Sequence, residues 1–232
     1  AVLVAREGES SRLLLRRLDQ FDGRPLAGTE GAWQPFFSPD GTSVAYFADR
    51  KLWRLALGGG SPVALAEVGR TPRGGSWGPD GTIVVGLSQT SGLYRVSSSG
   101  GPLEPLTRLD LQAGESSHRW PQVLPGGRWV LFSALTEGST WNDAVLEAVS
   151  LEDGKRRVVQ RGAAFGLFAG RGPLVFVNAG RLYGAAFDPE RLATTSVPEI
   201  LLEGVAYDPR NGGTQVALAS NEPLLYASGP SM

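Results

Sequence analysis

The tetrapeptide Ser38-Pro39-Asp40-Gly41 recurs as Gly78-Pro79-Asp80-Gly81 and, in weaker form, as Leu124-Pro125-Gly126-Gly127. Ala169-Gly170-Arg171-Gly172 keeps only the final glycine, and Ala219-Ser220-Asn221-Glu222 is a decayed fifth copy. The final glycines fall at positions 41, 81, 127 and 172, so successive copies lie 40, 46 and 45 residues apart. A period of this length indicates one supersecondary unit that is repeated side by side.

Each tetrad is expected to form a tight turn between two strands. Proline presets φ, an aspartate side chain accepts hydrogen bonds from nearby main-chain N–H groups, and glycine adopts positive φ without steric cost. The predicted turn residues are Asp40, Gly41, Asp80, Gly81, Gly127 and Gly172. Apolar runs rich in β-branched and aromatic residues flank the tetrads, and a third run, such as residues 51–55, alternates in character. These patterns favour β-strands.

The repeat predicts an all-β chain, a β-propeller of four-stranded antiparallel blades within a single domain, residues 1–232. Full blades are expected at approximately 33–68, 75–109, 119–161 and 164–204. Residues 12–31 and 214–228 are expected to share a fifth, composite blade that closes the ring and removes exposed strand edges. Residues 2–5 also resemble a second strand, which keeps six blades as the alternative.

Composition narrows the classes of partner. The 232 residues include 22 basic and 23 acidic side chains, and no run of Lys and Arg could follow a phosphate backbone, so we expect no nucleic-acid partner. Apolar stretches such as residues 44–48 are far shorter than the ~20 residues of a membrane helix, so we expect no membrane insertion. The chain opens at Ala1 without a signal peptide and has its one methionine at Met232, so we expect a piece of a longer protein.

The stretch Thr29-Glu30-Gly31-Ala32-Trp33-Gln34-Pro35-Phe36-Phe37-Ser38-Pro39-Asp40-Gly41 resembles the Pro-Asp-type, WD-like repeats of TolB-like propellers. Lys51-Leu52-Trp53-Arg54 and Gly58-Gly59-Gly60-Ser61-Pro62 fit the same resemblance, although only the first two repeats keep Pro-Asp-Gly. More narrowly, the chain resembles the propeller that follows the transmembrane segment in some bacterial eukaryote-like serine/threonine kinases. The resemblance implies an extracytoplasmic sensor or protein-interaction module and carries over no catalytic residue.

Repeat register predicts a binding site at one mouth of the central channel. In a propeller the first strands line this channel, and the position five residues before each tetrad is Trp33, Arg73, Arg119, Ala164 and Thr214 in turn. The predicted ligand-binding residues are Trp33, Gln34, Arg73, His118, Arg119 and Trp120. Aromatic rings and Arg side chains suit a protein segment or a small polar or anionic ligand. The alternative is a capped channel that holds only water.

Catalysis has little support in the sequence. His118 is the one histidine and, although Ser116, Ser117 and Asp110 lie near it, no Gly-x-Ser-x-Gly elbow is present, so we interpret His118 as a polar loop residue. One histidine and no cysteine cannot supply a zinc site, and no EF-hand spacing occurs, so neither a metal nor a cofactor is expected. The prediction is a non-catalytic binding propeller, a sensor or scaffold. The alternatives are the gating propeller of a serine peptidase and a hydrolase or lyase with its site at the channel mouth.

Overall fold

The computed structural model describes residues 1–8, 10–20, 22–218 and 224–229. Four sheets in it have four antiparallel strands each. They comprise β4 (Trp33–Phe37), β5 (Ser43–Ala48), β6 (Lys51–Ala56) and β7 (Val63–Glu67); β8 (Gly75–Trp77), β9 (Thr82–Gly86), β10 (Leu93–Ser97) and β11 (Glu104–Pro105); β12 (Glu115–Val123), β13 (Trp129–Thr136), β14 (Val145–Ser150) and β15 (Arg156–Arg161); and β16 (Phe165–Leu167), β17 (Leu174–Asn178), β18 (Arg181–Ala185) and β21 (Glu199–Leu202).

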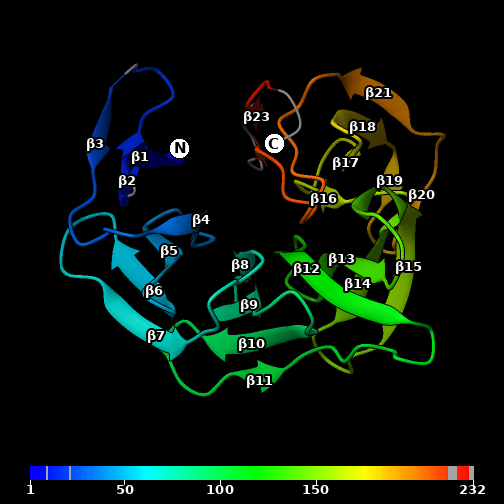
Figure 1. The fold of residues 1–232 in the computed structure, drawn as a ribbon, viewed down its shortest axis with the longest axis horizontal. Coiled ribbons are helices and arrows are strands. Elements are labelled where there is room, and N and C mark those ends of the chain that lie inside the picture. Colours follow the sequence, from blue (N-terminus) through cyan, green and yellow to red (C-terminus); the bar gives the residue numbers. More distant parts are fainter. Residues whose placement is uncertain (9, 21, 219–223, 230–232) are drawn as a thin grey trace.

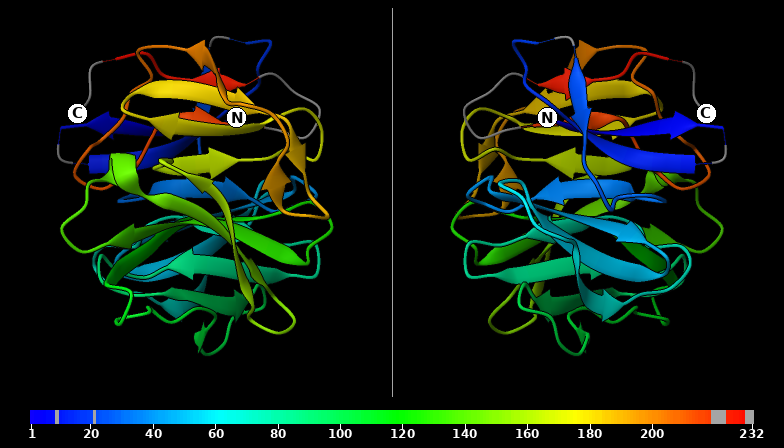
Figure 2. Two further views of the ribbon diagram at one scale, coloured as in Figure 1. Left: turned by 90° about the vertical axis from the view of Figure 1, so that its right-hand side faces the viewer. Right: turned by 90° about the vertical axis from the view of Figure 1, so that its left-hand side faces the viewer.

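A three-stranded sheet at the N-terminus is the remaining blade. It contains β1 (Val2–Glu7), β2 (Ser10–Arg16) and β3 (Gly23–Pro25). The five blades surround a common axis, with β4, β8, β12 and β16 nearest to it (Figure 1). The strands run roughly along that axis (Figure 2), so residues at one end of the inner strands meet at one end of the channel. The predicted five-bladed, all-β propeller is confirmed.

The predicted composite blade is wrong. Within the described residues, β22 (Val216–Ala217) pairs with β23 (Leu225–Tyr226) in a separate sheet, and β1 to β3 form theirs without either strand. Figure 1 shows β23 apart from the N-terminal blade. The physical reason is that β1 itself takes the second-strand place beside β2, while hairpin pairing of β22 with β23 closes a far shorter loop. The decayed tetrad at 219–222 lies outside the described residues.

The tetrads form tight turns by the chemistry expected of them. Asp40 Oδ1 accepts a hydrogen bond from the main-chain N–H of Thr42 at 3.0 Å, and Asp80 Oδ1 accepts one from Thr82 at 2.9 Å. The final glycines all have positive φ, with values of 69° at Gly41, 85° at Gly81, 70° at Gly127 and 74° at Gly172. Each turn connects the first strand of a blade to its second strand.

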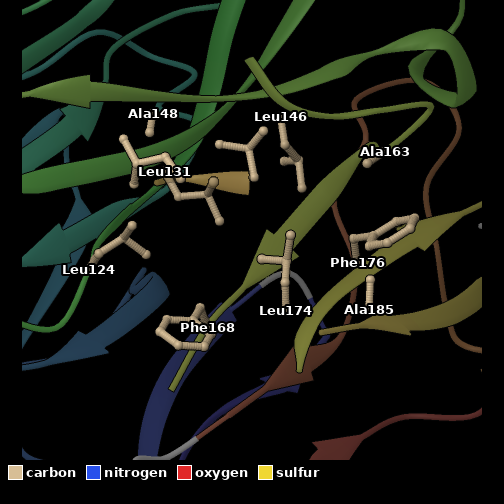
Figure 3. Packing of buried hydrophobic residues seen from close by; sticks show 11 residues of the cluster. Leu124, Leu131, Leu146, Ala148, Ala163, Phe168, Leu174, Phe176 and Ala185 are labelled. Carbon is tan, nitrogen blue, oxygen red and sulfur yellow. The ribbon is translucent and has the colours of Figure 1, made fainter. Parts of the chain in front are cut away.

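The core lies between neighbouring blades. Second strands such as β5 and β9 are apolar and buried on both faces, because each is covered by a blade on either side. Figure 3 shows one such layer, in which Leu131 and Leu146 of one blade pack with Leu174 of the next. Burial of each such side chain contributes about 1.5–3 kcal/mol. Blade-to-blade packing therefore fixes the inner strands that line the channel.

Two small elements complete the described structure. A hairpin of β19 (Phe187–Asp188) and β20 (Ala193–Thr194) lies between β18 and β21, and Phe187 packs against Phe168 with 4.9 Å between ring centres. A short 3-10 turn, η1 (Trp141–Asp143), precedes β14. In the part of the chain that is described, no helix has the length and apolar character needed to cross a membrane.

Candidate binding site at the channel mouth

Three inner strands depart from regular β-structure at the same repeat position, four residues before the tetrad. The φ values there are 48° at Gln34, 88° at Gly74 and 55° at Trp120. The ladders that contain Gln34 and Trp120 also shift register at these residues, as β-bulges do. Positive φ costs a residue other than glycine roughly 1–2 kcal/mol, so surrounding contacts must hold Gln34 and Trp120 in place.

These residues join the inner strands of successive blades. Gln34 Oε1 accepts a hydrogen bond from the N–H of Gly74 at 2.9 Å, and the N–H of Trp120 donates to the carbonyl of Arg73 at 2.8 Å. A Cβ atom on Gly74 would lie 3.0 Å from the Trp120 ring, so glycine permits this close approach. The structure thus brings together Gln34, Arg73, Trp120 and, next to Trp120 in the chain, Arg119.

Arg119 is only 5% exposed and uses its guanidinium donors inside the protein. Nε donates to Ser117 Oγ at 2.8 Å, Nη1 to the carbonyl of Asn211 at 3.1 Å, and Nη2 to the carbonyl of Gln89 at 3.2 Å. The guanidinium carbon lies 4.3 Å from the centre of the Trp141 ring, in a cation–π contact. Arg119 is therefore an anchor for other segments of the chain.

The segment held by Arg119 is a tight turn, residues 208–213, which we call the mouth loop. The N–H of Asp208 donates to the carbonyl of Gly213, and the N–H of Gly212 donates to the carbonyl of Asp208, both at 2.9 Å. Asn211 Nδ2 donates to Asp208 Oδ2 at 2.6 Å. In Figure 1 the chain between β21 and β23 returns towards the inner strands. The mouth loop is thus a closed turn at the edge of the channel.

The mouth loop packs closely against two indole rings, those of Trp120 and Trp141. Trp120 Nε1 donates to the carbonyl of Asn211 at 3.1 Å, the same oxygen that Arg119 binds. A Cβ atom on Gly212 would lie 2.7 Å from the Trp141 ring, and one on Gly213 would lie 3.1 Å from the Trp120 ring. Only glycine lets the main chain come this close.

Arg73 has fewer partners than Arg119. Its Nη1 donates to the carbonyls of Thr71 at 3.3 Å and Pro72 at 3.0 Å, while Nε is buried without a hydrogen-bond partner. Burial lowers the pKa of Arg73, and the charge of Asp208 partly offsets this. Burial, and then the charge of Arg73, lower the pKa of Arg119 to about 10. The ion pairs found among the described residues include neither arginine.

Trp33 and His118 do not face the mouth as the register suggested. Trp33 packs in the apolar layer between two blades, 5.9 Å from Phe47 between ring centres. His118 is fully buried within β12, so its interpretation as a loop residue is wrong. Its Nδ1 lies 2.7 Å from Thr107 Oγ1 and its Nε2 lies 3.1 Å from Glu115 Oε2. Both ring nitrogens are therefore engaged in a link between blades.

Glu115 extends this link to the outer strands of its own blade. Arg156 donates to both carboxylate oxygens of Glu115, and its Nε donates to Glu147 Oε2 at 2.8 Å. Burial raises the pKa of Glu115, but hydrogen bonds with His118 and Arg156 outweigh it, so that the pKa lies below its ordinary value. The cluster is a structural clamp, which the sequence did not reveal because its members come from four separate strands and loops.

Other features of the described residues lie away from the mouth. Two shallow surface hollows have volumes of about 250 and 380 Å³, and their lining includes Trp129 and Glu152 in one and Asp80 and Arg95 in the other. No group of three or more His, Cys, Asp or Glu side chains in the described part of the chain is placed to hold a metal ion.

Two mouth residues that the sequence analysis did not assign are Asp208 and Trp141. The turn-forming composition of residues 208–213 was the available signal.

Comparison with known proteins supports the fold. No family model matches the chain. A chain of the nidogen/laminin complex has a TM-score of 0.67 at 16% identity, over 98% of this chain and 84% of that one. A putative TolB from Agrobacterium tumefaciens has a TM-score of 0.62 at 18% identity, over 87% and 76%. A puromycin hydrolase mutant has 0.54 at 20%, over 80% and 35%. Identities this low show a shared fold alone.

The resemblance to TolB-like propellers that the sequence suggested is confirmed at the level of the fold. The narrower resemblance to kinase-associated propellers stays a prediction, and so does the assignment of ligand-binding residues.

Proposed function

We propose that the chain is a non-catalytic binding propeller whose channel mouth recognises an anionic ligand through Arg73. The observation that carries the proposal is the arginine pair. Arg73 lies just before the inner strand β8 and Arg119 lies in the adjacent inner strand β12. Burial, and then the charge of Arg73, lower the pKa of Arg119, and the ion pairs of the described residues include neither arginine. An uncompensated charge that is partly buried costs free energy, and a bound anion removes that cost.

The two arginines have different roles in this proposal. Arg119 is occupied with three internal acceptors and supplies positive potential. Arg73 is partly exposed and its guanidinium donates only to the nearby carbonyls of Thr71 and Pro72, so it is the side chain able to form a new charge-assisted hydrogen bond. The engagement of both nitrogens of His118 supports a binding function rather than a histidine-dependent hydrolase.

In its larger context, we propose that the propeller serves as a sensor or scaffold of a bigger bacterial protein, such as a receptor-type serine/threonine kinase. The shared fold with TolB and with a chain of the nidogen/laminin complex supports a binding module. The alternative, a gating propeller of a serine peptidase, has the puromycin hydrolase likeness in its favour. Flanking gene sequence separates the two: a kinase and membrane span upstream supports the first, and a Gly-x-Ser-x-Gly hydrolase downstream supports the second.

The test is calorimetric titration with citrate, a small tricarboxylate, at low ionic strength. Wild-type protein should bind citrate, and Arg73→Gln should lose that binding. Arg70→Gln is the matched control, because Arg70 is an exposed arginine three residues away in the chain. Equal affinity of wild type and Arg73→Gln, or equal loss in both variants, would refute the proposed site.

A further inference from the structure

Asn211 and Gly212 form an Asn-Gly pair within the mouth loop, and Gly213 follows them. In such a pair the main-chain nitrogen of the glycine can attack the side-chain carbon Cγ of the asparagine, because glycine has no Cβ atom in the path. Asn211 Oδ1 also accepts a hydrogen bond from the N–H of Gly213 at 2.7 Å. This bond folds the side chain of Asn211 back towards the main chain of Gly212, and it polarises the carbonyl group that is attacked.

The docked loop holds both reacting groups. The N–H of Gly212 donates to the carbonyl of Asp208 at 2.9 Å, and Asn211 Nδ2 donates to Asp208 Oδ2 at 2.6 Å. The attack therefore requires the loop to open for a moment. Pro209 and Arg210 are exposed and residues 208–213 belong to no strand, so such an opening costs far less free energy than unfolding of the whole propeller.

We propose that Asn211 is a modification site, and that its spontaneous deamidation releases the mouth loop from the channel mouth. The nitrogen of Gly212 forms a bond to Cγ of Asn211 and loses its proton, and Nδ2 leaves with that proton as ammonia. Water then adds to one of the two carbonyl groups of the resulting cyclic imide and opens it. Opening at the former side-chain carbonyl gives an aspartate, and opening at the main-chain carbonyl gives a β-linked aspartate. The proposal is independent of an anionic ligand at Arg73.

The aspartate product cannot restore the contacts of the docked loop. Asn211 Nδ2 is a donor that lies 2.6 Å from Asp208 Oδ2, and deamidation puts a carboxylate oxygen in its place. Two carboxylates at this separation repel each other, and neither has a proton to donate to the other. The turn that Asn211 and Asp208 close is therefore opened by the new charge.

The β-linked product changes the chain itself. Its main chain is one carbon longer at position 211, because the former side chain now carries the peptide bond to Gly212. The carbonyl that accepts hydrogen bonds from Arg119 Nη1 and Trp120 Nε1, each at 3.1 Å, is then no longer part of that peptide bond. Gly212 fits against the Trp141 ring without room for a Cβ atom, so the displaced chain cannot keep this contact.

The first experiment ages the folded protein at mildly alkaline pH and follows each asparagine by protease digestion and mass spectrometry. Asn211 should lose its amide at least about tenfold faster than Asn142 and Asn178, because each of those precedes a residue with a Cβ atom. Both aspartate forms should be present among the products. A sample unfolded in urea gives the rate of the same pair without the loop structure. If Asn211 in the folded protein is retained, or is lost no faster than Asn142 and Asn178, it is not a modification site.

The second experiment measures release of the loop. Trp120 Nε1 donates to the mouth loop, so its indole N–H signal in nuclear magnetic resonance should shift in the aged protein, and the melting temperature should fall. Asn211→Asp reproduces the aspartate product and should give a similar shift.

Gln215→Glu is the matched control for the added charge, because Gln215 is an exposed amide close to Asn211 in the chain, and it should leave the Trp120 signal in place. If Asn211→Asp does not fold, the aged protein, which folded before it was modified, still gives the readout. An unchanged Trp120 signal in the aged protein, or an equal shift in Gln215→Glu, overturns the release of the loop.

Discussion

The guanidinium of Arg119 and the main-chain carbonyl of Asn211, 92 residues apart in the chain, are joined by a hydrogen bond of 3.1 Å. This contact connects an inner strand of the blade formed by β12 to β15 with the segment that follows the last full blade. It explains why Arg119 is buried without a carboxylate partner, since its charge is distributed over main-chain carbonyls, a hydroxyl and an aromatic face. Under the proposed function, Arg119 stabilises the fold at the mouth and its neighbour Arg73 binds the ligand.

Substitutions of the two arginines should therefore change the free energy of unfolding by different amounts. Arg119→Lys keeps the charge but cannot reach three acceptors, so it should lower the free energy of unfolding by about 2 kcal/mol or more. Arg73→Gln removes a partly buried charge with an unpaired Nε and should change it by less than about 1 kcal/mol. Urea denaturation measures both. Equal losses in the two variants would contradict the separate roles.

The turn formed by the first tetrad allows the loss of stability in Gly41→Ala to be predicted. Its φ of 69° is unfavourable for alanine, whereas a Cβ atom would meet nothing within 4 Å, so backbone strain is the whole effect. Gly41→Ala should therefore lose about 1 kcal/mol. Gly58→Ala is the control, because Gly58 lies in equally open space without positive φ, and it should be neutral in the same thermal melt. Neutrality of Gly41→Ala would contradict the turn assignment.

At Gly212, a side chain would meet both an unfavourable positive φ and a steric clash. A Cβ atom there would come within 2.7 Å of the Trp141 ring while φ is 75°. Gly212→Ala should therefore destabilise the protein by more than Gly41→Ala does, and it should displace the mouth loop from the indole rings. Thermal denaturation, with tryptophan fluorescence as the readout of loop position, checks both parts. A melting temperature above that of Gly41→Ala would show that the loop is not packed on Trp141.

The stability that Glu115 contributes should depend on pH. Because its pKa in the folded protein lies below the ordinary value of 4.5, its contribution is fully present above pH 4.5 and is lost as the pH falls below that value. Glu115→Gln should lose about 1–3 kcal/mol at neutral pH, since Arg156 and His118 lose a charged acceptor. The difference from wild type should shrink as the pH is lowered through this range.

The control for Glu115 is Glu104→Gln. Glu104 forms an ion pair with Arg95 at 3.1 Å, but its side chain is 59% exposed, so its loss should cost at most about 1 kcal/mol. Denaturant titrations at several pH values separate the two carboxylates. If the stability difference between Glu115→Gln and wild type did not change with pH, the role given to the contacts of Glu115 with His118 and Arg156 would be contradicted.

Much of the fold could be predicted because its information is local. The tetrad that ends at Gly41 and its copies specify turns, and the runs around them specify strands, so blade order follows from the sequence. The pairing of the terminal strands could not be predicted from the same pattern. Residues 2–5 and 224–228 both match a second strand, and local pairing of β22 with β23 decided the outcome.

The candidate site could be predicted from the sequence only in part. Repeat register predicts that Arg73, Arg119 and Trp120 are neighbours, because equivalent positions of a radial fold are neighbours, and the structure has Arg73 just before β8 and the other two in the adjacent strand β12. It could not give side-chain direction, since the positive φ at Gln34 and Trp120 interrupts the alternation of the strand. It also could not show that residues 208–213 would dock on Arg119, because that contact depends on packing between distant segments.

The central claim, that an anionic ligand binds at the mouth beside Arg73, is tested most directly by nuclear magnetic resonance of the indole N–H groups. Six tryptophans give six indole signals, which Trp→Phe variants assign. On titration with citrate, the signals of Trp120 and Trp141 should shift, while those of Trp53 and Trp129 should stay in place. Shifts confined to Trp53 or Trp129, or shifts at Trp120 that persist in Arg73→Gln, would contradict the account.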